Sequence, residues 1–355
     1  MHVGANSFAH RLSHVRINSH LQRAIVLVGW TTALLRSYGF NFFGLNLLGG
    51  HRPKVEPATH APLLSDTELA EIAALAAETP AGRRMSEHLQ RGEQASRFRG
   101  AGIDFEDLRP YQPGDDPRRI DWRVTARLKK TFVRVYGETR QAALWVVMDR
   151  GASMRFGTRT RLKATQAARW GALLLSGATR AHEAIALSLL DGEQHISHTP
   201  RAGRAALYAT LDAMRAPCPP RNDTAPSQWT NVLSELEISL PHGARLWLFS
   251  DFLGLSDADE RLLERLAARA DVRLGLIEDA QEIELPQLGR AQLMTGGTSV
   301  EIDTQAAAVR KAYADYRTAQ HARLHALALR LRGHLVLARA DDDLPQLAMR
   351  LLEGA

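Results

Sequence analysis

Short apolar runs alternate with longer amphipathic stretches from about residue 142 onward. Continuous apolar runs predict buried strands, and the stretches between them carry apolar residues at helical spacing. Strands are predicted at 143–148, 184–190, 245–250, 272–277 and 334–338, with an antiparallel edge strand at 194–199. Helices are predicted at 160–180, 201–215, 230–239, 257–269, 304–331 and 344–352. This alternation predicts an α/β fold, a doubly wound, mostly parallel sheet flanked by helices on both faces.

The region before this alternation is predicted to be helical at first and rich in loops afterwards. A helix should begin at Ser65-Asp66, because Glu68 and Glu71 in its first turns interact favourably with the helix dipole. From 92 to 122 the chain is dense in Gly, Pro, Arg and Asp and shows little periodicity. A short helix that ends at 126–130 and a strand at 132–136 follow. We therefore predict three parts: an extension and linker at 1–60, a helix plus an Arg/Asp-rich segment at 61–140, and the sheet domain at 141–355.

The first 60 residues are basic and partly apolar. They hold six Lys and Arg against one Glu, so they carry most of the net charge of +6. The rest of the chain is close to neutral, so we expect no nucleic-acid partner. Apolar runs at 24–35 and 40–48 are broken by Arg36 and Asn41 before they reach the roughly 20 residues that span a bilayer.

Membrane contact is therefore expected only through residues 1–50 of a cytoplasmic protein. Three interpretations of that segment stay open: an interfacial anchor, a weak membrane segment, or an extension absent from the working protein. The single cysteine, Cys218, excludes an intramolecular disulfide and a cysteine-based metal cluster. It fits a reducing compartment without proving one.

Acidic residues follow two of the apolar runs. Asp149 comes directly after one predicted strand, and Asp251 follows another with Ser250 between. Ligands bind open α/β sheets at the carboxyl ends of the strands. Mg²⁺ prefers oxygen ligands, and Ser153 and Thr230 lie in loops expected at the same edge. The sequence thus predicts a Mg²⁺ or Mn²⁺ site. A structural alternative stays open, in which the two aspartates only cap helices and bind loop amides.

The order Asp-x-x-x-Ser, then Thr, then Asp resembles the metal-ion-dependent adhesion site of von Willebrand factor type A domains. The resemblance implies that Asp149, Ser153, Thr230 and Asp251 are the metal ligands. That family has a second serine two positions after the first aspartate, where this chain has Gly151. The missing hydroxyl should weaken the site without abolishing it, because Mg²⁺ accepts water ligands.

A long motif before the sheet carries a second resemblance. Its parts are Arg99-Gly100-Ala101-Gly102-Ile103-Asp104-Phe105, Leu108-Arg109-Pro110-Tyr111 and Pro113-Gly114-Asp115-Asp116-Pro117-Arg118-Arg119-Ile120-Asp121-Trp122. Over about residues 85–345 the chain is similar to bacterial "domain of unknown function 58" proteins. The resemblance implies a type A-like domain that acts with MoxR-type AAA+ ATPases in protein assembly or metal insertion. It implies no established enzymatic activity.

The charged residues of this motif allow two compatible roles. In the first, ion pairs fasten the loop while Phe105 and Trp122 anchor it on the sheet. In the second, the motif is a recognition surface for a partner protein. The candidate partner-binding residues are Arg99, Arg109, Asp115, Asp116, Arg118, Asp121 and Trp122.

We therefore predict a non-enzymatic protein-interaction module. Its cation would bind an acidic side chain of a MoxR-type ATPase or of that ATPase's client. The alternative is a metal-dependent phosphoester hydrolase that uses Asp149 and Asp251. The chain contains no Gly-x-x-x-x-Gly-Lys-Ser/Thr loop, so it should not hydrolyse ATP itself. The stretch 306–331 has a basic face, which is either solvated or binds a partner.

Overall fold

A six-stranded sheet forms the centre of the protein. The computed structural model describes residues 43–47, 61–78, 105–111, 120–136, 143–158, 160–219, 227–285, 287, 289–295 and 298–353. The strand order is β11-β8-β7-β4-β5-β6. These strands are β4 (Ala143–Asp149), β5 (Ala184–Asp191), β6 (Gln194–Ala202), β7 (Arg245–Ser250), β8 (Asp271–Glu278) and β11 (His334–Arg339). Every neighbouring pair is parallel except β5 and β6. The predicted doubly wound, mostly parallel sheet with one antiparallel edge strand is confirmed.

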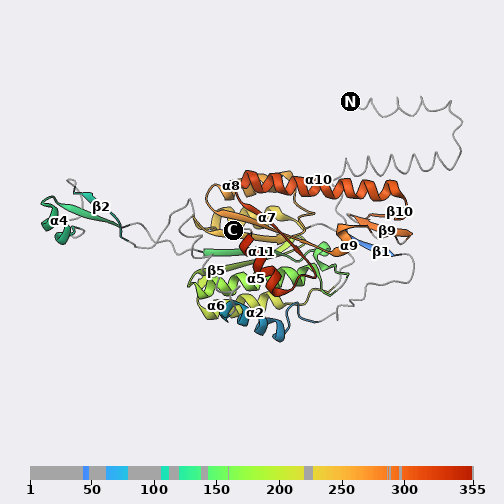
Figure 1. Cartoon of the computed structure of the whole chain (residues 1–355), viewed down its shortest axis with the longest axis horizontal. Helices are drawn as coiled ribbons and strands as arrows, with labels where there is room; N and C mark the ends of the chain where they lie inside the picture. Colours follow the sequence, from blue (N-terminus) through green and yellow to red (C-terminus); the bar gives the residue numbers. More distant parts are fainter. Residues whose placement is uncertain are drawn as a thin grey trace, which may run out of the picture.

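Helices cover both faces of this sheet (Figure 1). One layer contains α5 (Lys163–Arg180), α6 (Arg204–Arg215), α11 (Leu344–Glu353) and α2 (Asp66–Glu78). The other contains α7 (Trp229–Ser239), α8 (Asp257–Ala267) and α10 (Ala307–Leu331). All six predicted helices of the sheet domain are present. Three of them, α5, α6 and α10, begin three residues later than predicted; before α6, the edge strand β6 extends to Ala202.

Strand β4 shows why the apolar runs predict this sheet. All seven of its residues are buried. Leu144, Val146 and Met148 pack into the core beneath α5, whereas Trp145 and Val147 pack into the core on the opposite face. A strand covered on both faces reads as a continuous apolar run. Burying each of these larger side chains contributes roughly 1.5–3 kcal/mol.

Helix α2 begins where the sequence predicts. The Ser65 hydroxyl accepts a hydrogen bond from the Glu68 amide at 3.1 Å, and the Glu68 carboxylate accepts one from the Ser65 amide at 3.0 Å. This reciprocal pair is a capping box, which satisfies two amides that the first turn leaves free. Leu64 and Ile72 then bury this segment in the same apolar cluster as α5.

Two smaller groups of strands accompany the main sheet. β1 (Phe43–Leu47), β9 (Arg290–Thr295) and β10 (Thr298–Asp303) form an antiparallel sheet that the pattern did not predict. β2 (Phe105–Pro110) pairs antiparallel with β3 (Phe132–Tyr136), and α4 (Trp122–Leu128) lies between them in sequence. We call the residues 105–111 and 120–136 the hairpin unit; Figure 1 draws it to one side of the sheet. None of the helices described here is long and apolar enough to cross a membrane.

Candidate functional site

The site lies where the strand order of the sheet reverses. From β4 the chain continues to β5 on one side and later returns as β7 on the other side of β4. Asp149 is the last residue of β4, Ser250 is the last residue of β7, and Asp251 follows it. Such a switch point at the carboxyl ends of parallel strands is where doubly wound sheets bind ligands. The predicted location of the site therefore agrees with the topology.

The Asp149 carboxylate is buried and accepts three hydrogen bonds. One oxygen accepts from the Gly151 amide at 2.8 Å and from the Ser227 hydroxyl at 2.6 Å. The other oxygen accepts from the Ser250 hydroxyl at 2.6 Å. Hydroxyls and an amide therefore bind this carboxylate, and no ion pair to it forms among the described residues.

Burial raises the pKa of Asp149 from 3.8 to about 6. The negative charge of Asp251 adds to this rise, whereas the hydrogen bonds from Ser227, Ser250 and Gly151 oppose it because they stabilise the ionised form. The Asp149 carboxyl group therefore changes between its protonated and ionised forms near pH 6.

Gly151 and Ser227 fit each other sterically. A Cβ atom at position 151 would lie 2.0 Å from the Ser227 hydroxyl oxygen, so this space has no room for a side chain from residue 151. The hydroxyl missing after β4 is therefore supplied by the loop that precedes α7. Gly151 itself has φ −60°, a conformation open to any residue, so the contact with Ser227 rather than the backbone favours glycine here.

Asp251 is bound by a buried lysine. The Lys163 ammonium, at the first residue of α5, donates to Asp251 Oδ2 at 2.8 Å and to Glu282 Oε1 at 2.5 Å. Lys163 is 0% exposed. Burial alone would lower the pKa of Lys163, but the negative charges of Asp251 and Glu282 raise it by more. The pKa of Lys163 therefore lies above the ordinary lysine value. The ammonium stays charged and joins α5, the loop after β7, and α9 (Ala280–Ile283).

The other two predicted ligands have different surroundings. Thr230 is exposed, and its hydroxyl donates to Asp259 Oδ1 at 2.7 Å, which ties α7 to α8. Asp259 belongs to the capping box of α8. Ser153 is buried in the single turn η3 (Ala152–Arg155) after β4. The hydroxyl that the α7 loop brings to Asp149 is that of Ser227, three residues before Thr230, and metal binding by Ser153 and Thr230 stays a prediction.

These contacts do not fit a directly bound divalent cation. Position 151 has no hydroxyl, Thr230 binds Asp259, and Asp251 binds an ammonium. Within the described part of the chain, no group of three or more His, Cys, Asp and Glu residues is arranged to hold a metal ion. Binding of Mg²⁺ or Mn²⁺ stays a prediction that the geometry does not favour.

Other acidic residues at this edge of the sheet also have cationic partners within the chain. Arg155 donates to both carboxylate oxygens of Asp191, at the end of β5, at 2.7 Å. At the end of β8, Glu278 pairs with Arg317 and is also hydrogen-bonded, at 2.7 Å, to His321. After β11, Arg350 lies 2.7 Å from Asp342. The carboxyl edge is thus rich in acids whose charges are balanced internally.

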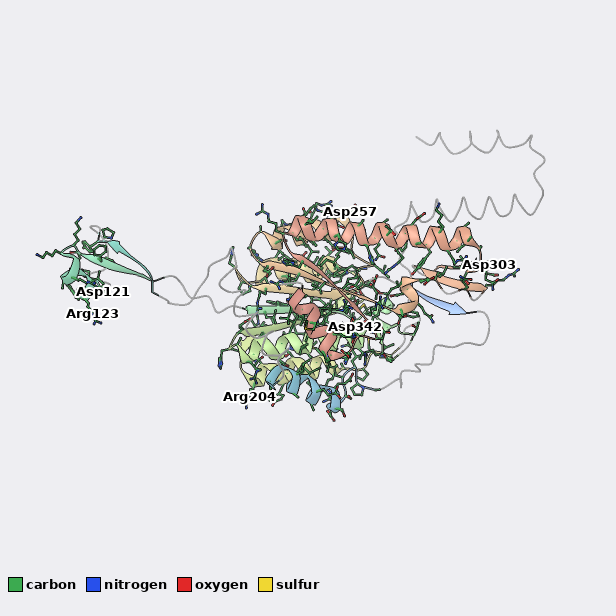
Figure 2. All side chains as sticks on the ribbon, in the orientation of Figure 1. Asp121, Arg123, Arg204, Asp257, Asp303 and Asp342 are labelled. Atoms are coloured by element: carbon green, nitrogen blue, oxygen red, sulfur yellow. The ribbon has the colours of Figure 1, made fainter. Side chains whose placement is uncertain are left out.

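The partner-binding residues predicted in the signature motif fall partly on the hairpin unit. Arg99, Asp115, Asp116 and Arg118 lie outside the described residues, and Arg109 lies on β2 opposite Val133 of β3. Asp121 is buried and caps α4, accepting from the amides of Arg123 and Val124 at 3.0 and 3.1 Å. Trp122, the first residue of α4, is 68% exposed, so it does not anchor the motif on the sheet. Figure 2 shows Asp121 and Arg123 on this unit.

Three basic residues of α10 bind neighbouring elements. Arg323 and Arg330 pair with Glu260 of α8, and Arg330 also lies 2.7 Å from Glu264. Arg317 pairs with Glu278. These three arginines therefore join α10 to α8 and to the end of β8.

Sequence reasoning missed four contributors to the site: Lys163, Ser227, Ser250 and Glu282. The sequence does not indicate that a lysine at the start of a helix is buried, since lysines are almost always exposed. Glu282 carries a weak signal, because Asp279 three residues earlier makes it part of a capping box. The signal for Ser227 is Gly151, the position where the adhesion-site pattern lacks its hydroxyl.

Comparisons with known proteins place the chain in a family. The family model described as "Protein of unknown function DUF58" matches residues 107–323. Uncharacterized proteins of Mycobacterium tuberculosis and Mycobacterium bovis are each 30% identical over 225 residues, which is 59% of this chain. The match spans 65% of the length of these relatives.

Two solved structures are similar to this chain. One is the conserved hypothetical protein BatB from Bacteroides thetaiotaomicron, with 9% identity, a TM-score of 0.38, and coverage of 60% of this chain and 98% of that one. Another is the SpRpn10 VWA domain, with 10% identity, a TM-score of 0.34, and coverage of 59% and 94%. The fold of this chain, with its one antiparallel edge strand, is von Willebrand factor type A-like. Because the family model matches more than half of the sequence, the chain belongs to the family of unknown function DUF58.

Proposed function

We propose that this chain is a non-enzymatic protein-interaction module that acts with a MoxR-type AAA+ ATPase, or with that ATPase's client, in protein assembly or maturation. The observation that carries the proposal is Trp122, which is 68% exposed within the family's signature motif. Exposed tryptophan and arginine side chains are the residues that most often dominate binding energy at protein interfaces. Arg123, the next residue, is also exposed.

The hairpin unit holds Trp122 in a defined position. The Asp121 amide donates to the Phe132 carbonyl at 2.9 Å, and the Phe132 amide donates to the Thr125 hydroxyl at 3.1 Å. The Tyr111 amide donates to the Thr131 carbonyl at 2.8 Å. The start of α4 is therefore fixed to β3 on one side and capped by Asp121 on the other. A pre-ordered backbone at Trp122 leaves less conformational freedom to lose on binding, which favours affinity.

The carboxyl edge of the sheet supports a role without catalysis. Three donors engage the Asp149 carboxylate and Lys163 engages Asp251, and both aspartates are buried. A phosphoester hydrolase would need a carboxylate or a metal that the substrate can reach. The contacts described here favour the binding module over the hydrolase. We propose that the partner is a protein rather than a nucleic acid. We also propose that this chain acts in the cytoplasm and that any membrane contact is confined to residues 1–50.

The test measures the affinity of the full chain for a purified MoxR-type ATPase of the same organism. Trp122→Ala should weaken binding by roughly 30-fold or more, as expected for a hot-spot residue worth about 2 kcal/mol. The matched control is Tyr208→Ala on α6, because Tyr208 is also 68% exposed but lies on the sheet domain. Absence of wild-type binding would exclude the ATPase as the direct partner and leave only its client. Equal affinities for the two variants would overturn the assignment of the interface to Trp122.

A further inference from the structure

We propose that Lys163 is the resident cation of this site, so that the type A-like domain of this chain is complete without a divalent metal ion. The ammonium lies 2.8 Å from Asp251 Oδ2 and 2.5 Å from Glu282 Oε1. The three residues come from α5, the loop after β7, and α9. One built-in positive charge therefore connects segments that are far apart in the sequence, as a bound metal ion would.

Both carboxylates are oriented toward the ammonium by backbone donors. The second oxygen of Glu282 accepts from the Asp279 amide at 3.1 Å, and the second oxygen of Asp251 accepts from the Leu253 amide at 3.2 Å. Each carboxylate thus offers one oxygen to Lys163 and gives the other to its own loop. Such satisfied hydrogen bonding is the condition under which a buried ion pair is tolerated.

The position of the ammonium opposes a metal ion on Asp251. Mg²⁺ binds oxygen at about 2.0–2.1 Å. An ion at that distance from Asp251 Oδ2 would lie within about 5 Å of an ammonium that is itself 2.8 Å from the same oxygen. Like charges at this separation repel strongly in a site that excludes water. The high pKa of Lys163, raised by Asp251 and Glu282, rules out relief by deprotonation near neutral pH.

The first experiment titrates Mg²⁺ and Mn²⁺, up to millimolar concentration, into the full chain by calorimetry. We expect no saturable binding that depends on Asp251. Binding that persists in both Asp251→Asn and Asp149→Asn would belong to another site and would agree with the proposal, whereas binding lost in Asp149→Asn would overturn it. Saturable wild-type binding that is lost in Asp251→Asn would overturn it, because the metal would then share the carboxylate assigned to Lys163.

The second experiment removes the ammonium. Lys163→Met leaves two buried carboxylates unpaired, and its Tm should fall by roughly 6–20 °C. The matched control is Lys311→Met, because Lys311 is an exposed lysine of α10. A Lys163→Met protein as stable as this control would overturn the proposal.

A third variant separates lost charge from lost packing. Combining Lys163→Met with Asp251→Asn and Glu282→Gln removes all three charges at once. This triple variant should recover most of the Tm, or fold where Lys163→Met alone does not. A triple variant no more stable than the single one would show that packing, and not charge balance, requires the lysine.

Discussion

The carboxyl edge of the sheet and the hairpin unit are both rich in charged residues, but they use them differently. At the sheet edge, buried acids bind cations or hydroxyls of the same chain, as Asp251 does with Lys163. In the hairpin unit, Asp121 caps α4 while Trp122 and Arg123 face solvent. The comparison teaches that acids at strand ends do not by themselves indicate a ligand site. What matters is whether the chain already supplies their partners.

The largest expected effect comes from the carboxyl edge of the sheet, where Asp149 should make the stability of the protein depend on pH. Its pKa of about 6 in the folded state exceeds the ordinary value of 3.8, mainly because of burial. The folded state therefore binds this proton more tightly than the unfolded chain does. The stabilising contribution of Asp149 to the free energy of unfolding is fully present below pH 3.8. It falls by roughly 3 kcal/mol in total as the pH rises through about 6.

Asp149→Asn should remove this dependence, because asparagine does not ionise. Denaturant unfolding of both proteins at several pH values between 4 and 7 measures the difference. The variant should gain roughly 3 kcal/mol relative to the wild type over that range. A stability difference between the two proteins that stays constant with pH would show that burial does not raise the pKa of Asp149.

The next effect is steric and tests the fit between Gly151 and Ser227. Gly151→Ser, which restores the adhesion-site pattern, should destabilise the fold by about 1–3 kcal/mol, since its Cβ would meet the Ser227 hydroxyl oxygen at 2.0 Å. Adding Ser227→Gly should restore most of the loss. Independent, additive effects of the two substitutions in thermal unfolding would contradict a direct contact.

A smaller effect is expected from the exposed ion pairs of α10. Arg330 contacts Glu260 and Glu264, and its side chain is 45% exposed. Arg330→Ala should therefore reduce stability by less than about 1 kcal/mol, and this loss should shrink in high salt. Unfolding curves at low and high ionic strength provide the measurement, and a salt-independent loss above about 2 kcal/mol would contradict it.

The smallest effect on stability should come from Trp122, although its effect on binding is expected to be large. Trp122→Ala should change the free energy of unfolding by no more than about 0.5 kcal/mol, since the side chain is mostly in water. Trp145→Ala, at a buried tryptophan of β4, should cost about 3–5 kcal/mol in the same assay. Similar losses for the two would mean that Trp122 is a structural residue.

The sheet was predictable from the sequence because its strands are buried on both faces. Strands β4 and β7 read as apolar runs, and Asp149 and Asp251 were correctly expected at their carboxyl ends. The β9–β10 pair was missed because its strands do not form such runs. The sequence Gly296-Gly297 between them is a usable hairpin signal. Strand β1 pairs with β9, a partner about 250 residues away, which no local pattern reveals.

The interior of the site was less predictable than its position. That Asp149 would meet Ser227, and Asp251 would meet Lys163, depends on packing between residues 78 and 88 positions apart. The resemblance to adhesion sites favoured Thr230, whose hydroxyl instead joins α7 to α8. Trp122 was predicted as either an anchor or a contact residue, because an apolar side chain in a loop-rich segment fits both roles. Its exposure excludes the anchor role, and the contact role stays a prediction.

Photo-crosslinking from position 122 tests the central claim most directly. A photoreactive phenylalanine analogue is placed at 122 of the full chain or, in a separate protein, at the equally exposed position 208. Each protein is irradiated in cells, and its crosslinks are identified by mass spectrometry. The account predicts crosslinks to the MoxR-type ATPase or its client from 122 and none from 208. No crosslink to either from 122, or equal crosslinking from 208, would contradict it.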